Sequence, residues 1–206
     1  MVAYALIILN CRRNAQKRHV QRTTWLRDFP IPLWFHVIGE PTLATEFEFD
    51  MADRILYVRC PDDYLSLPKK VYLAVMAIRT KFPDVGHILK ADDDMTYKQD
   101  GLRQVLKEME NYDYGGYMWY HEGGLSTYHY PNVNENDRKP VEIYKCTHAN
   151  GRFYFLSCKA ADYLIKQKPL MWKATFEDNA VGYALADCPD MKVLSLEDHT
   201  VFTEIV

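Results

Sequence analysis

The sequence lacks several features that define large classes of protein. Its five cysteines (Cys11, Cys60, Cys146, Cys158 and Cys188) are odd in number and include no C-x-x-C pair, which disfavours a disulfide framework or a structural zinc site. No run reaches the roughly 18 apolar residues that span a membrane, and the short apolar start has neither the basic beginning nor the cleavage site of a signal peptide. We therefore expect a cytoplasmic protein in a reducing compartment.

Strong net charge is also missing. The formal net charge of −3 gives no reason to expect nucleic acid or an anionic membrane as a partner. The 206 residues are enough for one domain with a full-sized core, and they contain no internal repeat or low-complexity tract. Further domains of a longer polypeptide stay open.

Strands and helices alternate along the first half of the chain. Strand-length apolar runs cover 4–9, 33–39, 54–58 and 85–89, helical patterns cover 15–26 and 68–79, and 40–53 is expected as a loop or a helix. The second half predicts strands at 113–119, 153–156 and 192–196, helices at 100–109 (capped by Asp100), 159–166 and 176–185, and an irregular loop at 121–138. This order is typical of an α/β fold whose mostly parallel central sheet is flanked by helices.

Three consecutive carboxylates, Asp92, Asp93 and Asp94, follow the expected strand at 85–89. Burying an isolated carboxylate costs on the order of several kcal/mol, so a strand that ends in this way is expected to meet a cation. Mg²⁺, Mn²⁺ and Ca²⁺ prefer such oxygen ligands, and open α/β sheets bind ligands beyond the carboxyl ends of their strands. The triplet predicts a metal site holding a phosphorylated ligand; a solvated acidic loop that caps the next helix is the alternative.

Three other places carry residues suited to the same chemistry. Arg12 and Arg13 follow the first strand, where a guanidinium donates two hydrogen bonds to a phosphate, although a solvated basic face explains them too. Glu177 and Asp178 open a helix, either as a general base or as charges that gain about 0.3–1 kcal/mol from the helix dipole. His199 follows the last strand, as a metal ligand or as a structural histidine.

Five separated segments match one known family in the right order. They are 18–25 (R-x-x-x-R-x-T-W), 62–70 (D-x-Y-x-N-L-T-x-K), 89–94 (K-x-D-D-D), 151–157 (G-x-G-Y-x-L-S) and 176–182 (E-D-V-x-V-G). The chain thereby resembles the β-1,3-galactosyltransferase and Fringe group (glycosyltransferase family 31) of metal-dependent GT-A glycosyltransferases. It also looks, more loosely, like glycosyltransferase domains of large algal DNA viruses, which would place it in the host cytoplasm.

The resemblance implies a fold and a reaction. The fold would be a single GT-A domain over 1–206, Rossmann-like, with a nucleotide-binding half at about 1–110 and a smaller acceptor and catalytic half at about 111–206. The reaction would be the inverting transfer of a hexose from a UDP-sugar to a hydroxyl group of a glycan acceptor, with Mn²⁺ or Mg²⁺ as the cofactor. The motifs leave the donor sugar, the acceptor and the linkage open.

The resemblance also implies roles for particular residues. Asp92, Asp94 and His199 would bind the metal, and Asp178, with Glu177 beside it, would be the catalytic base. The residues implied to contact the nucleotide sugar are Cys11, Arg12, Arg13, Lys70, Lys90, Asp92, Asp93 and Gly151.

Two departures and two alternatives remain. Phe153 stands where the family has Gly and Asn179 where it has Val, both at positions expected near the donor sugar or the acceptor. A metal-dependent phosphoryl-transfer or hydrolase domain built on Asp92 and Asp94 is one alternative. A sugar-binding module that has lost catalysis is the other. Neither explains the R-x-x-x-R-x-T-W and E-D segments.

Overall fold

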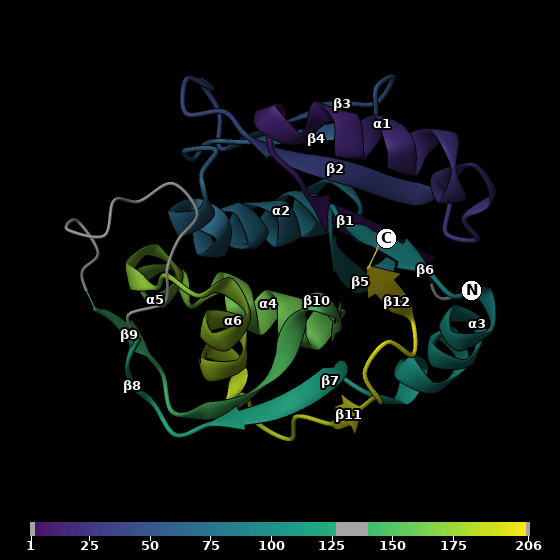
Figure 1. The fold of residues 1–206 in the computed structure, drawn as a ribbon. Coiled ribbons are helices and arrows are strands. Elements are labelled where there is room, and N and C mark those ends of the chain that lie inside the picture. The colour runs from purple at the N-terminus through teal and green to yellow at the C-terminus, as the bar shows by residue number, and fades with distance from the viewer. Residues whose placement is uncertain (1–2, 127–139, 205–206) are drawn as a thin grey trace.

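Eight strands form a central sheet that brings distant parts of the chain together (Figure 1). The computed structural model describes residues 3–126 and 140–204, and there the strands lie in the order β11-β7-β10-β5-β1-β2-β4-β3. Their bounds are β1 Ala3–Leu9, β2 Leu33–Gly39, β3 Phe47–Asp50, β4 Ile55–Val58, β5 Val85–Asp92, β7 Tyr114–His121, β10 Cys146–Ser157 and β11 Val193–Ser195. Two further pairs join β6 (Met95–Tyr97) to β12 (Phe202–Glu204) and β8 (Gly124–Ser126) to β9 (Val141–Ile143).

The centre of the sheet is parallel. β1 pairs in parallel with β2 and β5, and β2 with β4, so that Leu9 lies opposite Val37 on one side and Asp92 on the other. β11 is parallel to β7, whereas β10 and the edge strand β3 run antiparallel to their neighbours. The predicted α/β fold with a mostly parallel sheet is confirmed, and the carboxyl ends of β1, β2 and β5 meet at one edge.

Helices cover both faces of this sheet (Figure 1). One face carries α2 (Leu67–Lys81), α4 (Cys158–Ile165), α5 (Lys168–Lys173) and α6 (Glu177–Leu185). The other carries α1 (Ala15–Thr23), α3 (Gln99–Glu108), the β6–β12 pair and the 3-10 turns η2 (Trp25–Asp28) and η4 (Met109–Asn111). Two more 3-10 turns are η1 (Arg12–Asn14), which follows β1, and η3 (Tyr64–Ser66), which directly precedes α2.

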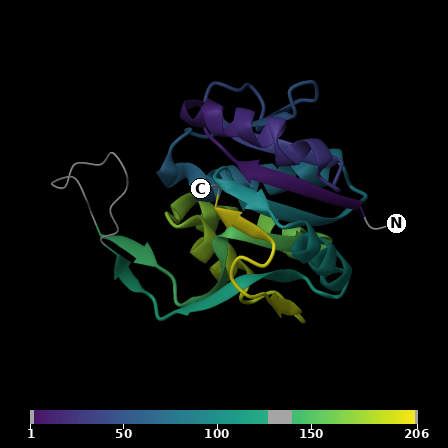
Figure 2. The ribbon, with the colours of Figure 1, turned by 45° about the vertical axis from the view of Figure 1, so that its right-hand side comes forward.

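The two hydrophobic cores explain why the central strands read as continuous apolar runs. In β1, Ala5 and Ile7 enter the core under α2, whereas Leu6 and Ile8 enter the core under α3. A parallel strand that is covered on both faces has no solvent side and therefore no alternation of polar residues. Figure 2 shows how β8 and β9 project from this two-sided body.

Segment 40–53, expected as a loop or a helix, contains the edge strand β3. Phe47 and Phe49 alternate with Glu48 and Asp50, and both phenylalanines pack against the core under α2. The segment is too short and too acidic for a buried strand, but this period-2 pattern suits an edge with one packed face.

Other elements also differ from the sequence prediction. β10 has 12 residues rather than the four at 153–156, because its polar first half lacks the apolar pattern and is held by pairing with β7. β5 continues through Asp92, so the first residue of the acidic triplet is still in the sheet. Lys98, not Asp100, is the N-cap of α3, and Asp100 lies exposed in its first turn. Helix α5 and the β6–β12 pair were not predicted.

Membrane-spanning helices are absent from residues 3–126 and 140–204, since none of the helices described there is both long and apolar enough for a bilayer. The irregular loop predicted at 121–138 falls mostly outside the described residues. Its first part forms the end of β7 and strand β8.

Close contact between α6 and β10 requires a glycine at position 182. A Cβ atom there would lie 2.3 Å from the Cβ of His148 and 2.8 Å from its Cα, well inside van der Waals contact. We expect Gly182→Ala to lose about 1–3 kcal/mol of unfolding free energy, the usual cost of an overpacked core. Urea denaturation checks this, with Gly151→Ala as the control, because the nearest atom to a Cβ at Gly151 is 3.4 Å away. Equal losses in the two variants would contradict the packing argument.

Candidate active site

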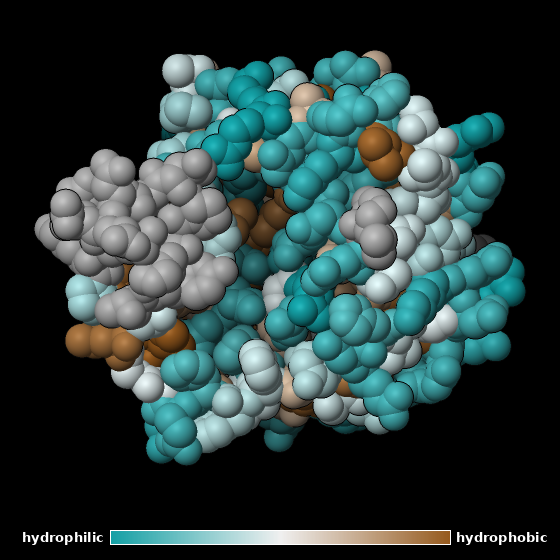
Figure 3. Space-filling model, viewed as in Figure 1, coloured by the Kyte–Doolittle hydropathy of each residue, from teal (hydrophilic) through white to brown (hydrophobic). Residues whose placement is uncertain are grey.

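A cleft of about 750 Å³ opens at the carboxyl ends of β1 and β5. Six of the residues predicted to bind the nucleotide sugar or metal line it: Cys11, Arg13, Lys70, Asp92, Asp93 and Asp94. The face drawn in Figure 3 is hollowed near its centre, where hydrophobic atoms lie among hydrophilic surroundings. A cleft of this volume and mixed lining suits a small organic ligand with charged groups.

Asp93 ties the acidic triplet to the segment after β1. One of its carboxylate oxygens accepts hydrogen bonds from Asn10 Nδ2 at 3.0 Å and Asn14 Nδ2 at 2.8 Å, and the other lies 2.9 Å from Lys17 Nζ. Its side chain is only 11% exposed. Both oxygens are thus used within the protein, so Asp93 acts as an anchor for the loop that follows β5.

Asp92 and Asp94 have oxygens left for a ligand. Asp92 contacts Lys90 through Oδ1 at 2.7 Å, and within the described residues its Oδ2 has no hydrogen-bond partner. Asp94 is half exposed, and within residues 3–126 and 140–204 its carboxylate has one polar contact, with Lys17, whose Nζ is 3.5 Å from its Oδ2. Loss of water around Asp92 raises its pKa, and Asp93 and Asp94 add to this, against the lowering effect of Lys90.

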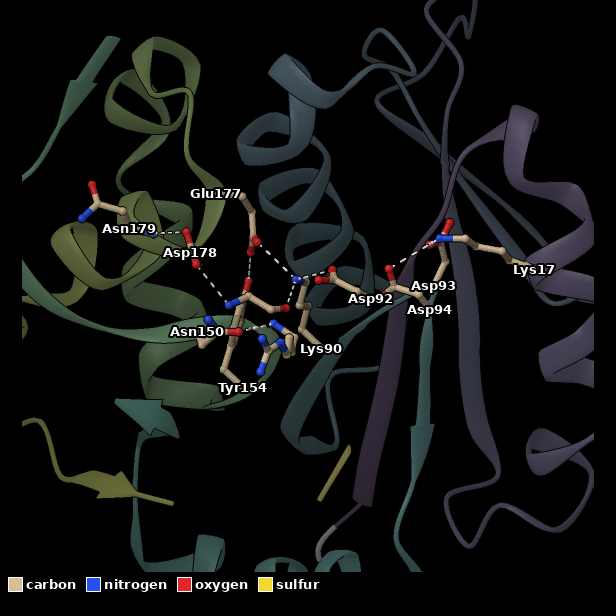
Figure 4. A network of polar contacts seen from close by, with 12 residues as sticks. Lys17, Lys90, Asp92, Asp93, Asp94, Asn150, Tyr154, Glu177, Asp178 and Asn179 are labelled. Carbon is tan, nitrogen blue, oxygen red and sulfur yellow. Dashed lines mark hydrogen bonds and ion pairs between the residues drawn. The ribbon is translucent and has the colours of Figure 1, made fainter. Parts of the chain in front are cut away.

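Lys90 is the centre of a buried charge network (Figure 4). Its Nζ lies 2.7 Å from Asp92 Oδ1 and 3.2 Å from Glu177 Oε2, donates to the carbonyl of Gly151, and sits 5.4 Å from the ring centre of Tyr154. The side chain is 1% exposed. Burial alone would lower the pKa of Lys90, but its two carboxylate partners outweigh burial and raise it, so the ammonium stays charged.

Glu177 is enclosed on all sides. Its Oε1 accepts from the hydroxyl of Tyr154 and its Oε2 faces Lys90. The pKa of Glu177 is raised to about 7, chiefly by burial, with Lys90 acting in the opposite direction and Asp178 and Asp92 adding to the rise. Because its oxygens are occupied and it is 6% exposed, Glu177 holds the site together rather than reaching a substrate.

Asp178 lies in the first turn of α6 and is more accessible than Glu177. Its Oδ2 accepts from the N–H of Gly151 at 3.1 Å, and its Oδ1 accepts from the N–H of Asn179 at 2.8 Å. These two bonds fix the orientation of the carboxylate and join β10 to α6. Of the two adjacent acids, Asp178 therefore has the geometry expected of a base, and Gly151 supplies backbone contacts to both sides of the network.

Lys70 and Asp62, which both line the cleft, form a second cluster of polar contacts. Lys70 Nζ donates to the carbonyl of Asn10 at 2.8 Å and to Asp62 Oδ1 at 2.7 Å. Asp62 also accepts from the N–H groups of Arg12 at 2.7 Å and Gly39 at 2.9 Å. Lys70 is 1% exposed, so it braces the ends of β1 and β2, with its charge close to the cleft.

The two arginines after β1 differ in their surroundings. Arg12 pairs with Glu40, lies 5.6 Å from the ring centre of Tyr57, and does not line the cleft. Arg13 lines the cleft and, among the described residues, has no hydrogen bond or ion pair. Arg13 is thus the guanidinium available to an anionic ligand.

His199 is not assembled with Asp92 and Asp94. Its Nε2 lies 3.3 Å from Arg152 Nη1 and 3.5 Å from Asp198 Oδ2, in a small pocket that these residues share. Its Nδ1 is buried without a partner in the described residues, and its backbone has a left-handed φ of 58°. Within residues 3–126 and 140–204, no three His, Cys, Asp or Glu side chains are grouped as metal ligands.

The two departures from the family pattern have structural explanations. Phe153 is 7% exposed and its ring stacks on Phe202, with centroids 5.1 Å apart, so it fills the core under β12. Asn179 is 3% exposed and its amide bonds both backbone groups of Tyr144, accepting at 2.8 Å and donating at 2.9 Å. Both side chains are buried in packing contacts, and their expected closeness to the donor sugar or the acceptor stays a prediction.

Sequence reasoning missed Lys17, Asn10, Asn14, Asp62 and Tyr154 as parts of the site. Each reaches the site through contacts between residues far apart in the sequence, such as Lys17 with Asp93 or Tyr154 with Glu177. One signal was present for Lys17, which follows the basic loop after β1 by less than two helical turns. For Asp62 the signal was its place at the start of the 62–70 segment.

The fold is of the GT-A-like class, with a large, mostly parallel central sheet flanked by helices. The chain belongs to the galactosyltransferase family, whose model matches residues 16–194. The resemblance drawn from the five segments is confirmed, and the chain is a glycosyltransferase. The phosphoryl-transfer or hydrolase domain and the non-catalytic sugar-binding module are therefore set aside.

Solved structures share the fold at low sequence identity. A glycosyltransferase involved in glycosylation of the major capsid of PBCV-1 is 13% identical, with a TM-score of 0.53 over 98% of this chain and 92% of that one. The 4-diphosphocytidyl-2C-methyl-D-erythritol synthase of Anaerococcus prevotii is 11% identical, with a TM-score of 0.54 over 99% and 90%. Comparison with curated proteins finds no match. These likenesses support the fold alone.

The raised pKa of Glu177 makes a pH-dependent contribution to stability. With a folded pKa of about 7, above the ordinary value of 4.5, the folded protein holds a proton that the unfolded chain releases between pH 4.5 and 7. This contribution to stability is present at low pH and is lost as pH rises through 7. Since Gln does not titrate, we expect Glu177→Gln to gain about 2 kcal/mol relative to the wild type between pH 5 and pH 8.

Urea denaturation at the two pH values measures this change. Glu48→Gln, which removes an exposed glutamate from β3, is the control and should show no such gain. A difference between wild type and Glu177→Gln that is the same at pH 5 and pH 8 would contradict the protonation of Glu177.

Proposed function

We propose that this glycosyltransferase transfers a hexose from a UDP-sugar to a hydroxyl group of a glycan acceptor, with inversion and with Mn²⁺ or Mg²⁺. The observation that carries the proposal is the Lys90 network. It joins Asp92, on the floor of the cleft, to Glu177, which is adjacent to Asp178. A donor in the cleft would therefore present its sugar toward a fixed carboxylate on α6.

The cleft suits a nucleoside diphosphate. Its volume of about 750 Å³ falls in the range of small-molecule sites, and Tyr64 and Leu65 supply apolar surface on one wall. Arg13 is free to bind the diphosphate with two hydrogen bonds, and Lys70 adds a positive charge behind it. Cys11 also lines the cleft and would contact the ligand through its backbone or thiol.

The metal would be held by Asp92 and Asp94, since both have carboxylate oxygens available at the cleft and hard divalent cations prefer such ligands. The ammonium of Lys17, 3.5 Å from Asp94 Oδ2, supports a position for positive charge beside this carboxylate. A bound metal would supply Lewis-acid stabilisation of the departing diphosphate. His199 would join only if the turn that carries it moved, because it now lies with Arg152 and Asp198.

Asp178 would act as the general base. Its carboxylate would take the proton of the acceptor hydroxyl while that oxygen attacks the anomeric carbon from the side opposite the diphosphate. Hydrogen bonds from the backbone N–H groups of Gly151 and Asn179 keep Asp178 oriented without using up all of its lone pairs. Glu177 and Lys90 would position this end of α6 and not touch the substrate.

Exposed aromatic residues on β7 offer a surface for the acceptor. Tyr117 and Trp119 are 36% and 51% exposed, lie on the same face of β7, and have ring centres 6.2 Å apart. Tyr117 also lines the small pocket that contains Asn150, the residue before Gly151. Flat apolar faces with nearby polar groups suit the faces and hydroxyl groups of a sugar ring.

The roles of Asp94 and Asp178 can be separated by mutation. We expect Asp178→Asn to lower kcat by about 10²–10⁴-fold, the usual value of a general base, and to leave Mn²⁺-dependent UDP binding unchanged. Asp94→Ala should lose transfer and also weaken UDP binding in the presence of Mn²⁺. Transfer assays and calorimetry with UDP measure these effects.

The control is Asp84→Ala, which changes the net charge by the same amount as Asp94→Ala. Asp84 is exposed and directly precedes β5, at the opposite end of the strand from the cleft. Asp84→Ala should leave both measurements unchanged. Equal UDP affinity in Asp94→Ala and wild type would contradict the metal assignment.

The acceptor surface makes a separate prediction. Trp119→Ala should weaken binding of a saccharide such as methyl β-galactoside about 2- to 10-fold, because the loss of one stacking face costs that much. Hydrolysis of the donor without acceptor should not change. Tyr120→Ala is the matched control, since Tyr120 is 53% exposed but points to the other face of β7. Saturation-transfer NMR measures saccharide binding, and an equal loss in both variants would contradict the assignment.

A further inference from the structure

Lys17 places a positive charge where the proposed metal would bind. Its Nζ lies 2.9 Å from Asp93 Oδ1 and 3.5 Å from Asp94 Oδ2 (Figure 4). Lys17 comes from α1, and Figure 4 shows it on the opposite side of the acidic triplet from Lys90. The contacts with Asp93 and Asp94 raise the pKa of Lys17, although burial works in the other direction.

The ammonium is held firmly on one side and loosely on the other. Asp93 is fixed by Asn10 and Asn14, so the 2.9 Å pair keeps Lys17 at the mouth of the triplet. Asp94 is 51% exposed and only 3.5 Å away, a weaker contact that the carboxylate can leave. Lys17 is thus held by Asp93, whose oxygens are used within the protein. It also contacts Asp94, the carboxylate proposed to bind the metal.

We propose that Lys17 makes the binding of the divalent cation and of the donor diphosphate depend on each other. The inference rests on the proposed function, in which Asp94 binds the metal. Without nucleotide, Lys17 neutralises part of the charge of Asp94 and repels a second cation. With the diphosphate present, Lys17 gains an anionic partner and no longer opposes the metal.

Electrostatics sets the size of the effect. With the dielectric constant of bulk water and with screening by salt, a unit charge about 4 Å from a divalent cation alters its binding about tenfold, so about tenfold is the lower bound at this partly exposed site. Linkage requires the coupling to act in both directions, so the metal should raise UDP affinity by the same factor by which UDP raises metal affinity. Removing the Lys17 charge should reduce that common factor.

The test uses Lys17→Met, which keeps most of the side chain and removes the charge. Calorimetric titration with Mn²⁺ alone should show about tenfold tighter binding in the variant than in the wild type. UDP without metal should bind more weakly to the variant. The ratio of Mn²⁺ affinities with and without UDP should therefore fall about tenfold or more.

Two further variants serve as controls. Lys17→Arg keeps the charge and should retain the coupling. Lys81→Met makes the same change in net charge at the far end of α2, about 20 Å along the helix from the cleft, and should behave as wild type.

The outcomes separate this inference from the proposed function. Unchanged or weaker binding of Mn²⁺ alone to Lys17→Met, with the wild type binding Mn²⁺ and UDP together, would overturn only the role of Lys17. A wild type that binds no Mn²⁺ even with UDP would overturn the metal assignment and this inference with it. Circular dichroism checks that each variant is folded.

Discussion

The buried ammonium of Lys90 is the interaction on which the rest of the site depends. It lies between two carboxylates, Asp92 and Glu177, and a backbone carbonyl, with almost no contact with solvent. Removing one partner of such a group leaves an uncompensated buried charge, at a cost of about 3–5 kcal/mol. The ends of β5, β10 and α6 are therefore held in one arrangement, and the relative positions of cleft and Asp178 follow from it.

The geometry of β5 explains how Lys90 contacts both Asp92 and Glu177. Successive side chains of β5 point to opposite faces, so Leu89 and Ala91 enter the core under α3 while Lys90 and Asp92 point toward α6. The next strand in the sheet, β10, is antiparallel and bulged between Ala149 and Tyr154, and this irregularity presents the backbone of Gly151 to Lys90 and Asp178. The carboxyl end of β5 thus supplies Asp92 and its counter-ion Lys90, and β10 supplies the N–H of Gly151 that donates to Asp178.

The sequence predicted much of this fold, because its central strands are short apolar runs with turn residues between them. The acidic triplet led to Asp92 and Asp94, and the end of the first strand led to Arg13; all three line the cleft. The family segment at 176–182 led to Asp178, which does not line the cleft but is adjacent to Glu177 in the Lys90 network. Partners such as Lys17 and Asp62 were not predicted, since a lysine on a polar helix or an aspartate in a turn has many uses and only distant contacts select one. For His199 the residue type suggested a metal ligand, but the structure places it beside Arg152 and Asp198 and not beside the acidic triplet.

The acidic triplet also shows why a run of identical residues need not have one role. Asp92 ends the strand and points to Lys90, Asp93 turns to Asn10, Asn14 and Lys17, and Asp94 reaches the open cleft. Each direction is set by the pleat of β5 and by the turn after it, not by the chemistry of the carboxylate. Two cations already neutralise part of this charge, Lys90 at Asp92 and Lys17 at Asp93 and Asp94. Of the three carboxylates of the triplet, Asp94 is the most exposed, at 51%, and it is therefore the one most open to the cation that the proposed donor would bring.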